Sequence, residues 1–275
     1  MHNPLLSIVI ANFNYGRFLE DAIISVVSQR AFEDCELIVV DGDSTDNSVE
    51  IIKKYADKIA WWVSEPDKGQ SDAFNKGFAR ARGKYLTWLN ADDLMPDGAL
   101  EKILQKMKRH PGCEWFTGNF FRFTEDGRVI EIGWGPHWYP VFLQRKNSPL
   151  VIFGPTSFFT KDLYERAGRI REDMHFMMDN DLWYRFVMMG VKLRRINCFC
   201  WAFRMHTGSK TAEFGDHKLS TDQRAKFELE RKSCLERTGY RCSGLMRRLC
   251  LAFRLLDFSL LRKFYYQRFF RHYEI

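Results

Sequence analysis

The chain has 275 residues, of which 45% are hydrophobic and 28% are charged, and this composition excludes a largely disordered protein. Lys and Arg outnumber Asp and Glu by 42 to 35, which gives a formal net charge of +7. The seven cysteines are odd in number and lack the regular spacing of a disulfide framework, so we expect reduced thiols.

The apolar stretches of the sequence are too short to predict a transmembrane segment. None reaches the roughly 18 uncharged apolar residues that a membrane-spanning helix requires. The N-terminal sequence MHNPLLSIVIANFN has no Lys or Arg ahead of its apolar run, so it predicts a buried strand and not a signal peptide. We therefore expect a cytoplasmic protein.

Apolar runs alternate with helical patterns over the first 90 residues. Strands are predicted at 6–11, 36–40, 58–63 and 85–89, and helices at 17–29, 48–55 and 71–82. The third helix has Ser71 as its expected N-cap and Gly83 just past its end. Such alternation predicts an α/β fold with a mostly parallel sheet covered by helices on both faces.

Three of these predicted strands end in polar side chains. Strand by strand, the polar segments contain Asn12 and Asn14, then Asp41, Gly42 and Asp43, then Asp92 and Asp93. Parallel α/β sheets bind their ligands at the carboxyl ends of the strands. We therefore expect a ligand site where these residues meet.

The adjacent acids Asp92 and Asp93 repel each other, and burying either without a partner would cost several kcal/mol. The sequence has no GxxxxGK[ST] loop and no GxGxxG after the first strand, which argues against a glycine-built phosphate site. Sites that hold phosphates without such a loop commonly use Mg²⁺ or Mn²⁺ on one or two carboxylates. We predict this role for the two acids, in preference to turn or helix caps.

Five motifs in order resemble the family 2 glycosyltransferases, which have the GT-A fold. They are SIVIANFN, VVDGDSTDNS, DKGQSDAFNKGFARARG, YLTWLNADD and MMDNDLWYRF, and the resemblance covers about residues 5–210. It implies a GT-A (Rossmann-like) catalytic domain at 1–215. The tail at 216–275 departs from the family core, and the spacing of its Leu and Phe residues predicts a helix. The resemblance also implies inverting, metal-dependent transfer of a sugar from a nucleotide-diphospho-sugar.

The resemblance assigns several residues to a nucleotide site. Asp41 matches the acid that hydrogen-bonds the base, and Ala11, Asn12 and Asn14 match the residues that line the same pocket. Asp72 matches a residue that faces the nucleotide. An acid in the first turn of a helix also interacts favourably with the helix dipole, so this second interpretation of Asp72 stays open.

The DxD metal motif of the family corresponds to Asn90, Ala91 and Asp92, and Asp93 follows. Because a neutral amide replaces the first acid, the resemblance makes Asp92 the main contact to the metal and the nucleotide, with Asp93 second. The expected cofactor is Mg²⁺ or Mn²⁺.

A later R-x-H-x-x-S pattern adds a histidine to the predicted site. The resemblance implies that His206 reaches the metal or the diphosphate, and that Arg204 and Lys210 can neutralise phosphate. Without the family pattern, a lone histidine at this position would carry little information.

Asp179 matches the family's general base, at the beginning of a helix predicted within 174–190. A hydroxyl that attacks an anomeric carbon must lose its proton as the bond forms, and a positioned carboxylate can accept that proton. The alternative role of Asp179 and Asp181 is to start the helix. Asp181 fits this role better, because it can pair with Arg185 at i+4.

Residues 240–275 hold eight basic residues against two acids, so they carry most of the net charge. Leu and Phe are interleaved with these arginines. We favour an interfacial helix on an anionic membrane over a helix that packs on the catalytic domain. No RNA-binding motif accompanies the basic residues, so we expect no nucleic-acid partner and a peripheral position at the inner face of the cell membrane.

The sequence thus predicts an inverting glycosyltransferase that uses a UDP-sugar and extends an acceptor glycan, with a lipid-linked intermediate of cell-surface polysaccharide synthesis as the expected acceptor. Trp134, His137 and Trp138 are candidates for stacking on sugar rings. One alternative is a nucleotidyltransferase that makes nucleotide-sugars, although the glycine-rich phosphate loop it would normally need is absent. The other is a non-catalytic binding module, which Asn90 and Met178 leave open.

Overall fold

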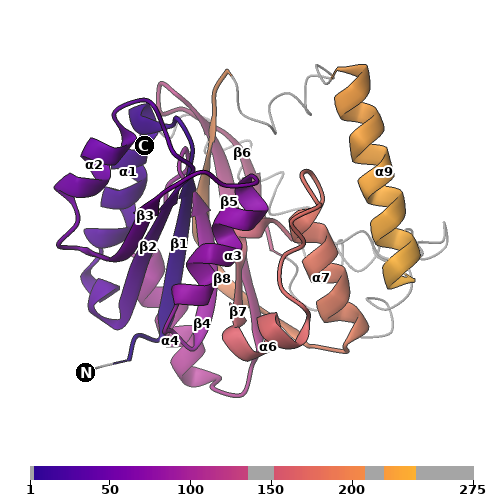
Figure 1. Ribbon diagram of the computed structural model, residues 1–275. Helices are drawn as coiled ribbons and strands as arrows, with labels where there is room; N and C mark the ends of the chain where they lie inside the picture. Colours follow the sequence, from indigo (N-terminus) through magenta and orange to yellow (C-terminus); the bar gives the residue numbers. More distant parts are fainter. Residues whose placement is uncertain (1–2, 136–151, 208–219, 240–275) are drawn as a thin grey trace.

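One mixed β-sheet runs through the computed structural model, which describes residues 3–135, 152–207 and 220–239 (Figure 1). Seven strands of this part of the chain lie in the order β3-β2-β1-β4-β7-β5-β6, and β8 pairs with β5. The predicted α/β fold is confirmed. The strands are β1 (Leu6–Asn12), β2 (Cys35–Asp41), β3 (Ile59–Ser64), β4 (Tyr85–Asn90), β5 (Trp115–Thr124), β6 (Val129–Gly133), β7 (Ser157–Thr160) and β8 (Leu193–Met205).

Helices cover both faces of the sheet (Figure 1). Alternate residues of β1 divide between the faces: Ile8 and Ile10 pack with α1, α2 and α4, whereas Val9 packs with α3, α6 and α7. The helices of the described residues are α1 (Gly16–Val27), α2 (Ser48–Lys54), α3 (Gln70–Arg80), α4 (Ala99–Arg109), α6 (Lys161–Arg166), α7 (Met178–Met188) and α9 (Thr221–Thr238).

The first four strands are parallel, and each lies within one residue of its predicted bounds. Their register places Asn12 opposite Asp41, Asp41 opposite Ser64, and Ala11 opposite Asn90. The polar residues at the carboxyl ends of these strands therefore meet at one edge of the sheet, as the sequence predicts.

The second half of the sheet brings β8 to the same edge. β7 pairs antiparallel with β4 and β5, and β8 runs parallel to β5. Near the end of β8, Ala202 exchanges two backbone hydrogen bonds with Leu94, in the loop after β4. This bridge brings His206, the residue that follows β8, to the segment that carries Asp92.

Helix α3 begins one residue earlier than the sequence predicts, and its N-cap is Gly69, not Ser71. Gly69 has φ +110°, a backbone conformation that side-chain-bearing residues rarely adopt. Ser71 lies inside the first turn, where its hydroxyl donates to the backbone carbonyl of Met174 at 2.8 Å. Ser71, the expected N-cap, therefore does not cap the helix but connects α3 to the loop before α7.

Stacked tryptophans hold the middle of α7 on the sheet. The Trp183 ring lies 5.6 Å from that of Trp88 on β4 and 5.7 Å from that of Trp115 on β5, with both pairs stacked. All three side chains are buried. The helix that carries Asp179 thus packs directly on two strands of the sheet.

Helix α9 belongs to the segment that the sequence assigns to the tail, and it lies against α7 (Figure 1). Phe227 packs edge-on to Phe176, and Arg237 forms an ion pair with Asp181. The basic residues at 240–275 lie outside the described residues. No helix in the described part of the chain is both long and apolar enough to cross a bilayer.

Candidate nucleotide-sugar site

The carboxylate of Asp41 joins the carboxyl ends of β1, β2 and β3. One oxygen accepts from Asn12 Nδ2 at 2.6 Å and from the Ser44 hydroxyl at 2.6 Å. The other accepts from the Ser44 N–H at 3.0 Å and from the Ser64 hydroxyl at 2.7 Å. Asp41 is completely buried, so in this structure its carboxylate holds the side chains and backbone around the predicted base site in place.

Ala11 and Asn12 are the last two residues of β1, and Asn14 follows in the loop after it. Asn12 is buried, and its Oδ1 has no hydrogen-bond donor among the described residues. Asn14 has φ +55° and accepts the Thr45 N–H at 2.8 Å, which holds the loop after β2 against the loop after β1. The orphaned Asn12 oxygen is an acceptor that a ligand could satisfy.

Asp92 and His206 contact each other directly, although 114 residues separate them. Asp92 Oδ2 lies 3.0 Å from His206 Nε2. The histidine is only 6% exposed and packs against the rings of Tyr15 and Phe18. The hydrogen bond to Asp92 raises the pKa of His206. The structure thus brings together two of the three predicted metal ligands.

Arg17, which the sequence analysis missed, extends this pair. Its Nη2 lies 3.0 Å from His206 Nδ1, and its guanidinium lies over the Phe18 ring. Arg17 occupies the first turn of α1, where the helix dipole disfavours a positive charge. A cation at this unfavourable position, just after a polar strand end, is the signal that could have identified it.

Asp93, predicted as the second metal ligand, does not have a ligand's placement. It is completely buried; one oxygen accepts the Arg204 N–H at 2.9 Å and the other accepts from Asn90 Nδ2 at 2.7 Å. Burial, together with the neighbouring charge of Asp92, raises its pKa well above the usual value. Asp93 instead connects the end of β8 to the end of β4 by these two hydrogen bonds.

Arg204 was predicted to neutralise phosphate, but its guanidinium already has protein partners. Its Nε donates to the backbone carbonyl of Asp92 at 3.0 Å, and its Nη2 lies 3.0 Å from Asp21 Oδ2. The side chain also lies over the Phe18 ring. Arg204 therefore supports the loop that carries Asp92, while Lys210 lies outside the described residues.

Asn90 uses both ends of its side-chain amide within the protein. Its Oδ1 accepts from Gln70 Nε2 at 3.0 Å, and its Nδ2 donates to Asp93. A carboxylate at position 90 could not donate, and its charge would lie next to that of Asp93. The replacement of the family's first acid by an amide thus fits a buried carboxylate at 93.

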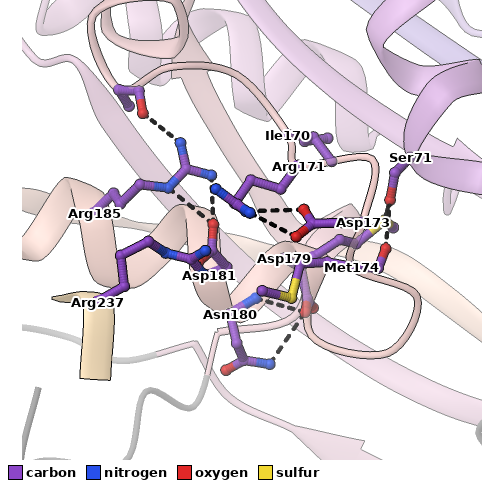
Figure 2. Close-up of polar contacts among 12 residues, drawn as sticks. Ser71, Ile170, Arg171, Asp173, Met174, Asp179, Asn180, Asp181, Arg185 and Arg237 are labelled. Atoms are coloured by element: carbon purple, nitrogen blue, oxygen red, sulfur yellow. Dashed lines mark hydrogen bonds and ion pairs between the residues drawn. The ribbon is translucent and has the colours of Figure 1, made fainter. Parts of the chain in front are cut away.

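Asp179 lies at the start of α7, as predicted (Figure 2). Its Oδ1 accepts the Asn180 N–H at 2.6 Å and Asn180 Nδ2 at 3.1 Å. Burial raises the pKa of Asp179 to about 6. A carboxyl group with this pKa is ionised at neutral pH and can accept a proton near the operating pH.

Asp181 has the structural role that the sequence predicts for it. It is completely buried and forms ion pairs with Arg185 at 2.7 Å and with Arg237 at 2.5 Å (Figure 2). The predicted i+4 pairing with Arg185 is confirmed. With two arginines on its carboxylate, Asp181 has little capacity left for a proton-transfer role.

Asp72 lies in the first turn of α3, and its contacts fit the start of a helix. Its Oδ2 accepts the Lys68 N–H at 3.0 Å and lies 3.5 Å from Lys76 Nζ. Among the predicted sugar-stacking residues, the structure describes Trp134, whose ring lies 5.7 Å from that of Phe199. His137 and Trp138 lie outside the described residues.

Comparisons with known proteins agree on one family. The family model "Glycosyl transferase family 2" matches residues 7–166. An uncharacterized glycosyltransferase of Rickettsia typhi is 27% identical over 200 residues, which are 69% of this chain and 60% of that protein. The chain spans between 32% and 60% of the length of the first three curated relatives.

Two solved structures share the fold. Staphylococcus aureus TarS in complex with UDP-GlcNAc has a TM-score of 0.58 at 14% identity, covering 75% of this chain and 60% of that one. Mannosyltransferase PcManGT from Pyrobaculum calidifontis, in complex with GDP-Man and Mn²⁺, has a TM-score of 0.57 at 17% identity, covering 76% and 59%. At these identities the likeness concerns the fold alone.

The adjacent acids should respond differently to removal. Asp93→Ala leaves the Arg204 N–H and the Asn90 amide without an acceptor, so it should lower the free energy of unfolding in urea by about 1–3 kcal/mol. Asp92→Ala leaves the buried His206 Nε2 without its partner and should also lower the free energy of unfolding, by about 1–3 kcal/mol, but this variant alone should weaken Mn²⁺-dependent binding of a nucleoside diphosphate, measured by calorimetry. The opposite pattern would show that the two roles are exchanged.

Proposed function

The chain belongs to glycosyltransferase family 2, and on that premise we propose that it moves a sugar from a nucleotide-diphospho-sugar to a hydroxyl of an acceptor glycan, with inversion at the anomeric carbon. The observation that carries the proposal is the Asp92–His206 pair with Arg17 beside it, at the carboxyl end of the parallel strands. A carboxylate, an imidazole and a guanidinium in contact are suited to a diphosphate and its cation.

The donor atoms of this pair fit a divalent cation. Asp92 Oδ2 and His206 Nε2 are joined by a hydrogen bond of 3.0 Å, and a bound metal ion would take the place of its proton. Within the described ranges no three His, Cys, Asp or Glu side chains gather as a metal cluster, so substrate phosphates would complete the ligands of Mg²⁺ or Mn²⁺. When bound, the ion would neutralise charge on the diphosphate leaving group.

The other walls of the site have the chemistry that a nucleotide donor requires. Arg17 offers a planar guanidinium to the phosphates. Asn12, whose buried Oδ1 has no donor among the described residues, lies at the strand ends where the base is proposed to bind, and we propose a UDP-sugar as the donor. Asp41 holds the Asn12 side chain in place by the 2.6 Å hydrogen bond between Nδ2 and the carboxylate.

Asp179 takes the proton of the attacking hydroxyl in this proposal. Inversion requires a single displacement, so the enzyme needs one carboxylate near the acceptor oxygen and no nucleophile of its own. The pKa of about 6 keeps Asp179 ionised at neutral pH while leaving it basic enough to accept the proton.

The basic segment at 240–275 is proposed to bind an anionic membrane surface at the inner face of the cell membrane. Each basic residue near such a surface contributes on the order of 1 kcal/mol. Docking would bring the catalytic domain to a lipid-linked acceptor that is confined to the bilayer.

The function is tested by incubating the protein with a panel of UDP- and GDP-sugars and Mn²⁺ and following nucleotide release. We expect UDP release from one donor and its loss when a chelator is added. Exchange of pyrophosphate into the donor would instead identify a nucleotidyltransferase. A rise in the midpoint of thermal unfolding with no turnover would identify a binding module.

The general base is tested with Asp179→Asn, which keeps the size of the side chain and removes the proton acceptor. We expect kcat to fall about 10²–10⁴-fold with the donor Kd nearly unchanged. Since the base must be ionised, wild-type kcat should fall as pH drops through about 6, and the variant should lack this limb. Asp173→Asn, an exposed acid before α7, is the control; unchanged turnover in Asp179→Asn would disprove the assignment.

The tail is tested with a chain that ends at Gly239, which retains α9. It should unfold at the wild-type temperature and bind nucleotide, but no longer sediment with vesicles of phosphatidylglycerol. The full chain should sediment with these vesicles at low salt, be released at high salt and ignore phosphatidylcholine, because salt screens exposed charges over about 8 Å at physiological strength. Sedimentation that does not depend on lipid charge would remove the membrane from the proposal.

A further inference from the structure

Glu230 of α9 binds the backbone just before α7. Glu230 is only 6% exposed. Its carboxylate accepts hydrogen bonds from three consecutive backbone N–H groups, those of His175 at 2.9 Å, Phe176 at 2.7 Å and Met177 at 3.1 Å. Met177 is the N-cap residue of α7, and its own side chain makes no capping hydrogen bond. A carboxylate from another helix therefore caps the approach to α7.

This contact stabilises a segment that would otherwise leave backbone donors unpaired. The N–H groups at a helix start have no partner within the helix, and a negative charge is favourable there because of the helix dipole. Three charge-assisted hydrogen bonds offset the cost of burying the Glu230 carboxylate. The position of this segment therefore depends on α9.

Arg237 makes a second tie between the two helices. It lies seven residues after Glu230, which is about two turns, so both side chains leave α9 on the same face. Its guanidinium contacts Asp181 at 2.5 Å (Figure 2). Cys234, also on this face, is completely buried. The second tie reaches α7 inside its first turn.

The two ties lie on either side of Asp179. Glu230 holds Met177, two residues before it, and Arg237 holds Asp181, two residues after it. The stacked Trp183 holds the middle of α7 on the sheet, one turn further along. Ser71 of α3 also contacts the start of α7, through the Met174 carbonyl and the Met178 sulfur. The place of the Asp179 carboxylate relative to the sheet edge therefore depends on α9 as well as on α3.

We infer that Glu230 and Arg237 are positioning residues for the reaction, which act through Asp179. The inference rests on the proposed function, in which Asp179 takes the proton from the acceptor hydroxyl. A displacement of about 1 Å in a reacting group can reduce the rate roughly 10²-fold, although binding of the donor is untouched. Helix α9 is then part of the catalytic unit.

The first test is Glu230→Gln, which keeps the size of the side chain but turns an NH₂ group toward backbone donors. We expect kcat to fall at least roughly tenfold, with the donor Kd unchanged, because the donor site lies at the strand ends. Arg237→Met should have a similar effect, and Arg237→Lys, which keeps the charge opposite Asp181, should restore part of kcat.

The matched control is the double variant Glu228→Gln with Arg231→Met. These residues form an exposed pair on the same helix, with side chains 54% and 50% exposed, and their charged groups contact each other. The control should retain wild-type kcat. A loss of kcat in the control as large as that in Glu230→Gln would overturn the inference, because any disturbance of α9 would then suffice.

The deciding measurement combines Glu230→Gln with Asp179→Asn. If Glu230 acts through Asp179, it should reduce kcat in the wild-type background and have no further effect once Asp179 is replaced. Equal reductions in both backgrounds, or a lowered unfolding temperature with wild-type kcat, would overturn the positioning role while the proposed function stands. If Glu230→Gln does not fold, Arg237→Met carries the same comparison.

The test also separates this inference from the function on which it rests. A wild-type protein that transfers sugar, with an Asp179→Asn variant that is fully active, would remove the proposed base and the positioning role together. A wild-type protein that loses turnover with Asp179→Asn but not with Glu230→Gln or Arg237→Met would remove only the positioning role.

Discussion

The arrangement of the residues at the carboxyl ends of β4 and β8 depends on the buried carboxylate of Asp93. It joins the Arg204 N–H on β8 to the Asn90 amide at the end of β4, two segments that are far apart in the chain. Together with the Leu94–Ala202 bridge and the hydrogen bond from Arg204 Nε to the Asp92 carbonyl, this contact holds Asp92 next to His206. Two adjacent acids are tolerated because one faces the protein interior, where donors meet it, and the other faces the site.

The sequence predicts the donor edge well because its signals are local. Apolar runs locate the four parallel strands within one residue, and in a parallel sheet their polar ends must meet. The contact between Asp92 and His206 is not local and came from the family pattern. Periodicity alone could not have shown that two residues 114 positions apart share a hydrogen bond.

The sequence fails where the direction of a side chain decides its role. Asp92 and Asp93 are adjacent residues of the same type, so the sequence does not distinguish their roles. The hydrogen bond from the β8 backbone to Asp93 shows that this side chain points inward. Helix α9 has a weak apolar pattern, and beside its few apolar contacts it docks through Glu230 and Arg237, which in the sequence look like ordinary charges on a helix surface. Arg17 was missed because its one signal, a positive charge in the first turn of a helix, does not show which residue it contacts, and its partner His206 is 189 positions away.

Two adjacent residues of α3 join the loop that carries Asp92 to the segment before α7. Gln70 donates to Asn90, which contacts Asp93 in that loop, and Ser71 donates to the Met174 carbonyl in the segment before α7. Gly69 makes this possible, because the helix starts from a residue with φ +110°, a backbone conformation that residues with side chains rarely adopt. The first turn of α3 therefore contacts both the loop after β4 and the segment before α7, so a shift of that loop would be transmitted to the segment that Glu230 contacts from α9.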